Sequence, residues 1–353
     1  MAVGKTAALG EIGSGTLAIL GCGALGTAIL LGLLSDSLDL PGVAKRNDGQ
    51  NGWSKAYRFV ACVRREQAAD TIRQKVQEVA PKASSLVDIQ VCNNVEAIRT
   101  ADIVLLAVQP HLLAELLQEP HMSDSLRGKI IISVLAGVTV NDIQSAITMN
   151  LETAVAAAAA QHTSPLELDS PPQKKNTYTI VRAMPNINCF AGQSTTIIER
   201  DSSSSSSSSS SMQDDNTLHL VSNLFHSLGK VFFTSPSTMN ACTALCGSTP
   251  AFFTIVLEGL IEGAIAAGLK PDEALQMLSH TMMGTGALMM SQGGRDPAAV
   301  RHQVTSPGGS TIRGVLSLEE NRVRWSFARA LEISAAKAGD LGGSSSGSSG
   351  SSK

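Results

Sequence analysis

The hexapeptide at 306–311, Ser-Pro-Gly-Gly-Ser-Thr, has the residue types of a small-anion site. Pro307 stiffens its entry, and the two glycines that follow let the backbone approach a ligand closely. Ser310 and Thr311 stand where a helix with apolar residues is expected to begin. Free amides at a helix N-terminus attract a carboxylate, but the dipole contributes only about 0.3 to 1 kcal/mol, so hydrogen bonds must supply most of the binding. The hexapeptide therefore indicates a site for a small acid, and an ordinary glycine-rich helix cap is the alternative.

A glycine turn near the N-terminus points to a second ligand, a dinucleotide. Gly21, Gly23 and Gly26 form a GxGxxG pattern directly after the apolar run 17–20, and a helical stretch follows at 28–34. In such a turn the first glycine permits tight reversal, the second permits close approach of a pyrophosphate, and the third permits close helix packing. The context of strand, turn and helix favours dinucleotide binding over a purely structural turn.

Two arginines after the next apolar run indicate which dinucleotide binds. Arg64 and Arg65 follow the run 58–63, at the place where NAD-preferring proteins usually carry an acid for the ribose hydroxyl. Two guanidinium groups suit a 2′-phosphate instead. We therefore expect NADPH as the hydride donor, with NADH possible and a surface charge pair as the alternative reading.

Along the chain, short apolar runs typical of strands alternate with helical stretches. This alternation predicts an α/β fold, with a doubly wound Rossmann-type parallel sheet covered on both faces. The expected strands are 17–20, 58–63, 103–108, 130–134, 178–182, 195–198 and 231–233. From about Met239 the pattern becomes helical. We expect a Rossmann domain over 14–237, a helical dimerisation and substrate domain over 238–341, and a disordered tail over 342–353. Disordered insertions are expected near 36–55, 156–176 and 201–216, because these stretches bury little apolar surface.

The helix expected at 251–267 is apolar on nearly every face. Gly268 is its natural stop, and Pro271 is suited to the first position of the next helix. One small helical domain does not need so much apolar surface. We therefore predict that a second subunit buries this helix.

Composition narrows the classes of function. The 353-residue chain has a formal net charge of -3, which favours a small-molecule role and gives no basic face for nucleic acid. The six cysteines, at 22, 62, 92, 189, 242 and 246, are interpreted as reduced core residues, and the seven histidines are not spaced as metal ligands. The N-terminus does not resemble a secretory signal, and the apolar segments fall short of a membrane span. We expect a cytoplasmic protein without metal or membrane.

Taken together, these motifs resemble those of the pyrroline-5-carboxylate reductase family. The matching segments, in chain order, are the nucleotide turn at 21–29, an AVKP-like segment at 106–110, an SxxAGVT-like segment at 134–139, RxMPN at 181–186, a TALSGSGPA-like segment at 243–251 and the C-terminal signature at 304–318.

The resemblance implies hydride transfer from NAD(P)H to the imine carbon of 1-pyrroline-5-carboxylate, giving L-proline in the last step of its biosynthesis. It also implies a homodimer, open to assembly into a larger ring, with an active site shared between subunits. The implied cofactor contacts are Gly21, Cys22, Gly23, Ala24, Leu25, Gly26, Thr27, Asn94, Ala107, Val108, Gln109, Pro110, Leu135, Ala136 and Gly137. The implied substrate contacts are Gly308, Gly309, Ser310 and Thr311.

Chemistry suggests roles for individual residues within this reaction. The Thr311 hydroxyl is the candidate catalytic group, since it is suited to contact the ring nitrogen as hydride arrives; a helix cap is the compatible alternative. Ser248 is a further candidate for the substrate site, with a buried serine satisfied by backbone as its alternative. Residues 184–186 are expected to shape the nicotinamide end.

The sequence also departs from the family pattern. Gln109 replaces the lysine of AVKP, Thr249 replaces a glycine, and Ser310 stands where threonine is common. The segment 236–240 lacks an acid that the family usually shows. These departures keep two other functions open: a related imine or hydroxyacid reductase, and a non-catalytic nucleotide-binding regulatory protein.

Overall fold

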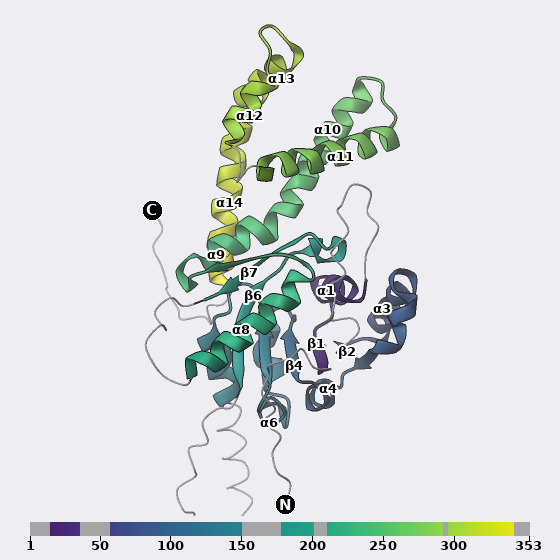
Figure 1. Cartoon of the computed structure of the whole chain (residues 1–353), viewed down its shortest axis with the longest axis vertical. Helices are drawn as coiled ribbons and strands as arrows, with labels where there is room; N and C mark the ends of the chain where they lie inside the picture. The colour runs from purple at the N-terminus through teal and green to yellow at the C-terminus, as the bar shows by residue number, and fades with distance from the viewer. Residues whose placement is uncertain (1–14, 36–56, 150–177, 201–209, 292–295, 342–353) are drawn as a thin grey trace, which may run out of the picture. The chain divides into compact units, whose positions relative to one another are not determined.

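A computed structural model describes residues 15–35, 57–149, 178–200, 210–291 and 296–341 (Figure 1). The chain divides into two compact units, residues 1–247 with 336–353 and residues 248–335. The expected insertions at 36–55 and 156–176 and the tail after 341 lie outside the described residues. The expected insertion at 201–216 is described only from residue 210, where a helix begins, so its last seven residues are helical rather than disordered.

The first unit is built on one eight-stranded sheet in the order β3-β2-β1-β4-β5-β6-β7-β8. Its strands are β1 (Gly15–Leu20), β2 (Tyr57–Val63), β3 (Val87–Val91), β4 (Ile103–Leu106), β5 (Ile130–Ser133), β6 (Thr179–Met184), β7 (Ser194–Glu199) and β8 (Gly229–Thr234). The order reverses at β1, which lies between β2 and β4, as in a doubly wound fold. The predicted fold class is confirmed.

The sheet differs from the expected one in two respects. β3 was not expected; it is a half-exposed strand at the edge, so its apolar residues form no continuous run. The pairing of β6 with β7 is antiparallel, whereas every other pair is parallel. The connection between these strands, residues 185–193, is shorter than the dozen or so residues that a parallel crossover needs.

Helices cover both faces of this sheet. The core on one face takes residues from α1 (Ala24–Leu34), α3 (Glu66–Val79) and α8 (Ser210–His226). The core on the other face takes residues from α4 (Asn94–Thr100), α5 (Leu113–Leu117) and α6 (Met122–Ser125). Shorter helical elements of the unit are η1 (Pro81–Leu86), η2 (Pro110–Leu112), η3 (Ile187–Ala191), η5 (Pro236–Thr238), α9 (Met239–Cys242) and the π-helix η6 (Thr243–Ser248). The strands are thus held between two apolar layers, which fixes the positions of the loops at their ends.

The second unit is helical. It contains α10 (Thr249–Ala266), α11 (Pro271–Met290), α12 (Pro297–Gln303), α13 (Ser310–Glu320) and most of α14 (Val323–Asp340). α10 ends at Ala266 with Ala267 as its C-cap, and the predicted stop, Gly268, follows with a φ of 100° and donates its N–H to the Ile265 carbonyl at 2.9 Å. Pro271 begins α11, also as predicted. Gly268 and Pro271 were therefore enough to predict the turn between α10 and α11 from the sequence.

α10 packs against α11, yet much of its apolar surface is exposed among the residues that the structure describes. None of its residues is buried, and Ile255 and Phe253 are 64% and 53% exposed. The helical stretch Pro236–Ala266 is long and apolar enough to cross a membrane by length and composition, with a mean hydropathy of 1.6 over a window of 18 residues. The expectation that every apolar segment falls short of a span is therefore wrong on these two criteria. A single such helix is weak grounds for a membrane span, and a partner subunit would cover the same surface.

Candidate functional site

The first glycine of the turn is required by its backbone conformation and by contact with a neighbouring segment of the chain, independently of any ligand. Gly21 follows β1 with a φ of 80°, and a Cβ there would lie 2.7 Å from the backbone N and Cα of Val108. The N–H groups of Gly21 and Cys22 donate to the Cys62 carbonyl at 3.2 and 2.9 Å. The turn is therefore fastened to the ends of both neighbouring strands, β2 and β4.

The other two glycines are required for different reasons. A Cβ on Gly26 would lie 3.2 Å from both the Gly21 carbonyl oxygen and the Ile19 Cγ2, so this glycine permits α1 to pack closely on β1. A Cβ on Gly23 would meet just one atom of the described chain, the Gly21 oxygen at 3.9 Å. The protein leaves space beside Gly23, which is also the N-cap of α1 and carries no capping side chain. The space and the adjacent helix amides suit a pyrophosphate.

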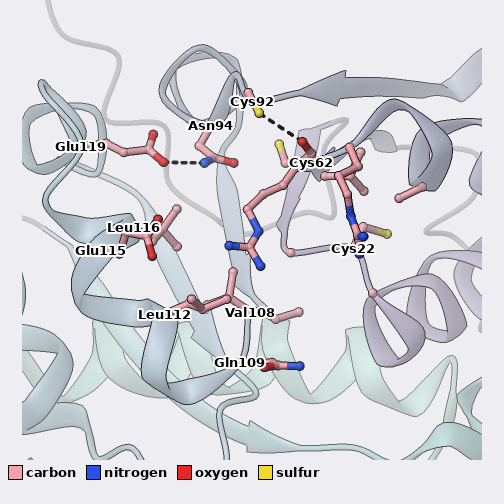
Figure 2. Close-up of a pocket in the computed structure, with 17 residues that line it drawn as sticks. Cys22, Cys62, Cys92, Asn94, Val108, Gln109, Leu112, Glu115, Leu116 and Glu119 are labelled. Atoms are coloured by element: carbon pink, nitrogen blue, oxygen red, sulfur yellow. Dashed lines mark hydrogen bonds between the residues drawn. The ribbon is translucent and has the colours of Figure 1, made fainter.

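A cavity of about 480 Å³ opens at this turn, at the carboxyl ends of β1, β2, β3 and β4 (Figure 2). Its lining residues are Gly21, Cys22, Gly23, Cys62, Val63, Arg64, Arg65, Ala68, Cys92, Asn94, Ala107, Val108, Gln109, Leu112, Glu115, Leu116 and Glu119. Ligands of open α/β sheets bind where the strand order reverses. The cavity therefore has both the place and the lining of a dinucleotide site.

Nine of the predicted cofactor residues line this cavity: Gly21, Cys22, Gly23, Arg64, Arg65, Asn94, Ala107, Val108 and Gln109. Eight others lie outside its lining: Ala24, Leu25, Gly26, Thr27, Pro110, Leu135, Ala136 and Gly137. The buried Thr27 hydroxyl donates to the Cys22 carbonyl at 3.3 Å, so it supports the turn from behind. Ala136 packs against a small cluster of Met184, Ile197 and Met239. Residues 135–137 thus lie at the end of β5, beside the RxMPN segment.

The two arginines lie at the mouth of the cavity. Arg64 directly follows β2, and Arg65 is the N-cap of α3. Both side chains are exposed, and in the described part of the chain neither takes part in an ion pair. Their guanidinium groups are available to an anionic ligand at the end of β2.

Sequence reasoning missed the acidic wall of the cavity. Glu115 and Glu119 line it from α5 and the turn after it, and Glu119 accepts a hydrogen bond from Asn94 Nδ2 at 2.7 Å (Figure 2). Helical spacing does not predict this pair, because Glu115 lies in α5 whereas Glu119 lies beyond its end at Leu117. The pair was also overlooked because carboxylates are not expected beside an anionic cofactor.

The cysteines are not all core residues, contrary to the sequence interpretation. Cys92 is exposed and lines the cavity, and Cys242 and Cys246 are half-buried. Burial raises the pKa of Cys22 to about 11. Burial, followed by nearby negative groups, raises the pKa of Cys62 to about 12. Both thiols are protonated at neutral pH, so neither is a nucleophile in this cavity.

The hexapeptide 306–311 belongs to the helical unit and begins α13 there. Gly308 has a φ of 70°, and Gly309 is the N-cap, where a Cβ would lie only 2.4 Å from Ser306 Oγ. No side chain caps α13, since its N-cap is a glycine. Ser310 and Thr311 are the first two residues of the helix, so neither occupies the capping position that was the alternative reading for Thr311. Both side chains are exposed.

The RxMPN asparagine holds three segments of the first unit together. Asn186, which is 6% exposed, donates from Nδ2 to the Cys246 carbonyl at 2.9 Å. Its Oδ1 accepts the Asn188 N–H at 3.1 Å, and its own N–H donates to Ser194 Oγ at 3.2 Å. The contact with Cys246 anchors η6, the π-helix that ends at the half-buried Ser248. π-helical turns are frequent at functional sites.

Comparisons with known proteins agree over most of the chain. Residues 236–341 match the family described as pyrroline-5-carboxylate reductase dimerisation, and residues 16–137 match the NADP oxidoreductase, coenzyme F420-dependent family. A pyrroline-5-carboxylate reductase of Lophium arboricola is 36% identical over 93% of both chains. A crystal structure of the Plasmodium falciparum pyrroline carboxylate reductase with NADP bound has a TM-score of 0.66 at 19% identity, covering 93% of this chain and 98% of that one, and shows the same fold.

The delta-1-pyrroline-5-carboxylate reductase kk1I of Curvularia clavata is 35% identical to this chain, with 93% of this chain and 97% of the relative covered. The relatives of this chain and the family model that matches its C-terminal helices lead to one assignment. The chain belongs to the pyrroline-5-carboxylate reductase family.

Proposed function

We propose that this protein catalyses the reduction of 1-pyrroline-5-carboxylate to L-proline with NADPH as the hydride donor. The membership of the family makes it an NAD(P)H-dependent oxidoreductase that acts on an imine. The observation that carries the proposal is the cavity at the point where the strand order reverses, with open space at Gly23 and α1 beginning beside it. A related reductase or a nucleotide-binding regulatory protein would share this cavity, and the relatives of 33 to 36% identity, all named as pyrroline-5-carboxylate reductases, favour the proposed reaction over both.

The preference for NADPH rests on the arginine pair. Arg64 and Arg65 line the cavity next to the end of β2, where the adenosine ribose is read in this fold. Their positive charges suit a 2′-phosphate, whereas a hydroxyl would leave them unused. Gln109 retains a hydrogen-bonding amide in the same cavity without adding a charge.

The substrate is assigned to the start of α13. The first amides of this helix have no capping side chain, so they remain available to the carboxylate of a cyclic imine. Gly308 and Gly309 shape the loop so that the ligand can approach the backbone, and Ser310 adds a hydroxyl. When bound, the cofactor supplies the hydride. The Thr311 hydroxyl is assigned the contact with the ring nitrogen, which becomes an amine as the reaction proceeds.

A homodimer completes the site in this proposal. The exposed apolar surface of α10 lies within the residues that match the dimerisation family, so a second copy is the occupant that fits it. The same burial removes the reason to assign the segment Pro236–Ala266 to a membrane. We assign Ser248 to the substrate site, the residues 135–137 and 184–186 to the nicotinamide end, and the protein to the cytoplasm.

Incubating the pure protein with NADPH and 1-pyrroline-5-carboxylate tests the proposal. The expected result is loss of NADPH absorbance with formation of an equal amount of L-proline. Cofactor binding without turnover would instead support a regulatory protein. Turnover with other cyclic imines or with hydroxyacids, but not with this substrate, would support a related reductase.

A further inference from the structure

The hydrogen bond between Asn94 and Glu119 joins two walls of the nucleotide cavity. Asn94 begins α4 just after β3, and Glu119 lies in the turn after α5, which follows β4. Asn94 Nδ2 donates to Glu119 Oε1 at 2.7 Å, a bond between residues 25 positions apart. Both side chains line the cavity. The bond is charge-assisted and part-buried, so it is stronger than an exposed contact between neutral groups.

The chemistry of the pair dictates how the Asn94 amide is oriented. An ionised carboxylate only accepts hydrogen bonds, so the NH₂ group of Asn94 must face Glu119. The amide oxygen, Oδ1, then lies on the other side, directed away from Glu119 into the cavity (Figure 2). The cavity thus presents a fixed acceptor at this point.

A fixed acceptor selects a donor on the ligand. The 2′-phosphate of NADPH offers oxygens that chiefly accept, and it is matched by the cations Arg64 and Arg65 at the end of β2. The backbone of Arg64 lies near this point, because Cys92 Sγ, two residues before Asn94, donates to the Arg64 carbonyl at 3.3 Å, and both arginines line the same cavity as Asn94. The donor nearest to a 2′-phosphate is a hydroxyl of the same ribose, which NADH and NADPH share.

We propose that Glu119 is a positioning residue which fixes the Asn94 amide so that its oxygen accepts from the adenosine ribose hydroxyl of either dinucleotide. The inference rests on the proposed function, because it needs a dinucleotide in this cavity. It divides recognition into two parts. Arg64 and Arg65 select the phosphate, whereas the Glu119–Asn94 pair recognises the ribose common to both cofactors.

The charge of Glu119 and its hydrogen bond to Asn94 have opposite expected effects on cofactor affinity. Glu119 carries a negative charge beside the site of an anionic cofactor, so removal of that charge alone would tighten binding. If Glu119 instead positions the Asn94 amide, its removal weakens cofactor binding. Glu115→Ala is the matched control, since it removes a carboxylate from the same cavity and leaves the Asn94–Glu119 bond in place.

Dissociation constants for NADPH and NADH, measured by quenching of protein fluorescence, are compared across the variants. Glu119→Ala and Asn94→Ala are each expected to weaken both cofactors about 10-fold, equivalent to about 1.4 kcal/mol. The double variant is expected to be no weaker than either single one, because the two side chains act as one unit. Glu119→Gln retains an acceptor and is expected to stay within about 3-fold of the wild type. Glu115→Ala is expected to bind as tightly as the wild type or more tightly.

Kinetics separate positioning from a loss of structure. In Glu119→Ala the KM for NADPH is expected to rise while kcat at saturating NADPH stays within about 2-fold, because the contact is to a remote part of the cofactor. Unchanged or tighter binding by Glu119→Ala would overturn the inference, as would additive losses in the double variant or a loss confined to NADPH. A loss that disappears with the hypoxanthine analogue of NADH would assign the contact to the adenine amino group and would also overturn it. If the wild type binds neither dinucleotide, the proposed function fails instead.

Discussion

Arg182 and Glu199 form a buried ion pair across the antiparallel step of the sheet, with 2.9 Å between Nη1 and Oε2. The side chain of Arg182 is 3% exposed and that of Glu199 is 13% exposed. Within the described residues, Arg182 Nε and Nη2 have no hydrogen-bond partner. The carboxylate of Glu199 is therefore the group that compensates the buried guanidinium of the RxMPN segment.

Loss of this carboxylate should be strongly destabilising. Glu199→Gln leaves a buried cation without its counter-charge, which typically costs about 3 to 5 kcal/mol. The free energy of unfolding from urea titrations is expected to fall by about that amount. Glu96→Gln, which breaks the exposed 3.4 Å pair with Arg99, is the control and should cost less than about 1 kcal/mol. Equal effects of the two variants would show that burial does not govern the Arg182–Glu199 pair.

Charge reversal at the arginine pair should separate the two cofactors. In the variant Arg64→Glu with Arg65→Glu, the carboxylates repel a 2′-phosphate, so the KM for NADPH is expected to rise by about 100-fold or more. The KM for NADH should change by less than about 5-fold, since that cofactor has no phosphate to repel. Steady-state kinetics with each cofactor measures the ratio. A similar rise for both would remove the assignment of these residues to the phosphate.

Removal of the Thr311 hydroxyl should slow the chemical step. Thr311→Val preserves shape but not the hydrogen bond to the ring nitrogen, and kcat is expected to fall about 100-fold. Ser317→Ala, on an exposed position of the same helix, should leave kcat near the wild-type value. The oligomeric state of both variants, measured by light scattering, should match that of the wild type. A wild-type kcat in Thr311→Val would remove its catalytic role.

A charge on the apolar surface of α10 should dissociate the subunits. Ile255 is 64% exposed in the single chain, and Ile255→Glu would place an unpaired carboxylate in the interface that we assign to this helix. Light scattering at micromolar concentration should show a dimer for the wild type and a monomer for this variant. Lys82→Glu, at an exposed position of η1, should remain dimeric. A monomeric wild type would contradict the dimer itself.

Stability should fall in alkaline solution because of the buried thiols. The pKa of Cys62 is raised from 9.0 to about 12 in the folded protein, chiefly by burial. The unfolded chain therefore loses this proton at a lower pH than the folded chain, and stability present below pH 9.0 declines as the pH rises towards about 12. Cys62→Ala should show a smaller loss of unfolding free energy between about pH 8 and about pH 10.5. Cys92→Ala, which removes an exposed thiol, should keep the wild-type decline.

Local signals in the sequence were enough for much of the fold. Gly21 and Gly26 can be placed from their spacing after an apolar run, and Gly268 and Pro271 mark the end of one helix and the start of the next. These features depend on backbone conformation and on close neighbours in the chain. The edge strand β3 was missed, because its half-exposed residues lack a strong hydrophobic pattern.

Other features depend on residues that are distant in sequence. The space beside Gly23, the pairing of Asn94 with Glu119 and the antiparallel step that brings Arg182 to Glu199 follow from how the strands are ordered. Composition predicted α10 to be a helix that a partner buries, but its exposed residues are identified only by the packing within the helical unit. Spacing along the chain thus specifies turns and helices, whereas the contacts that set charge and orientation in the cavity arise from packing between separate elements.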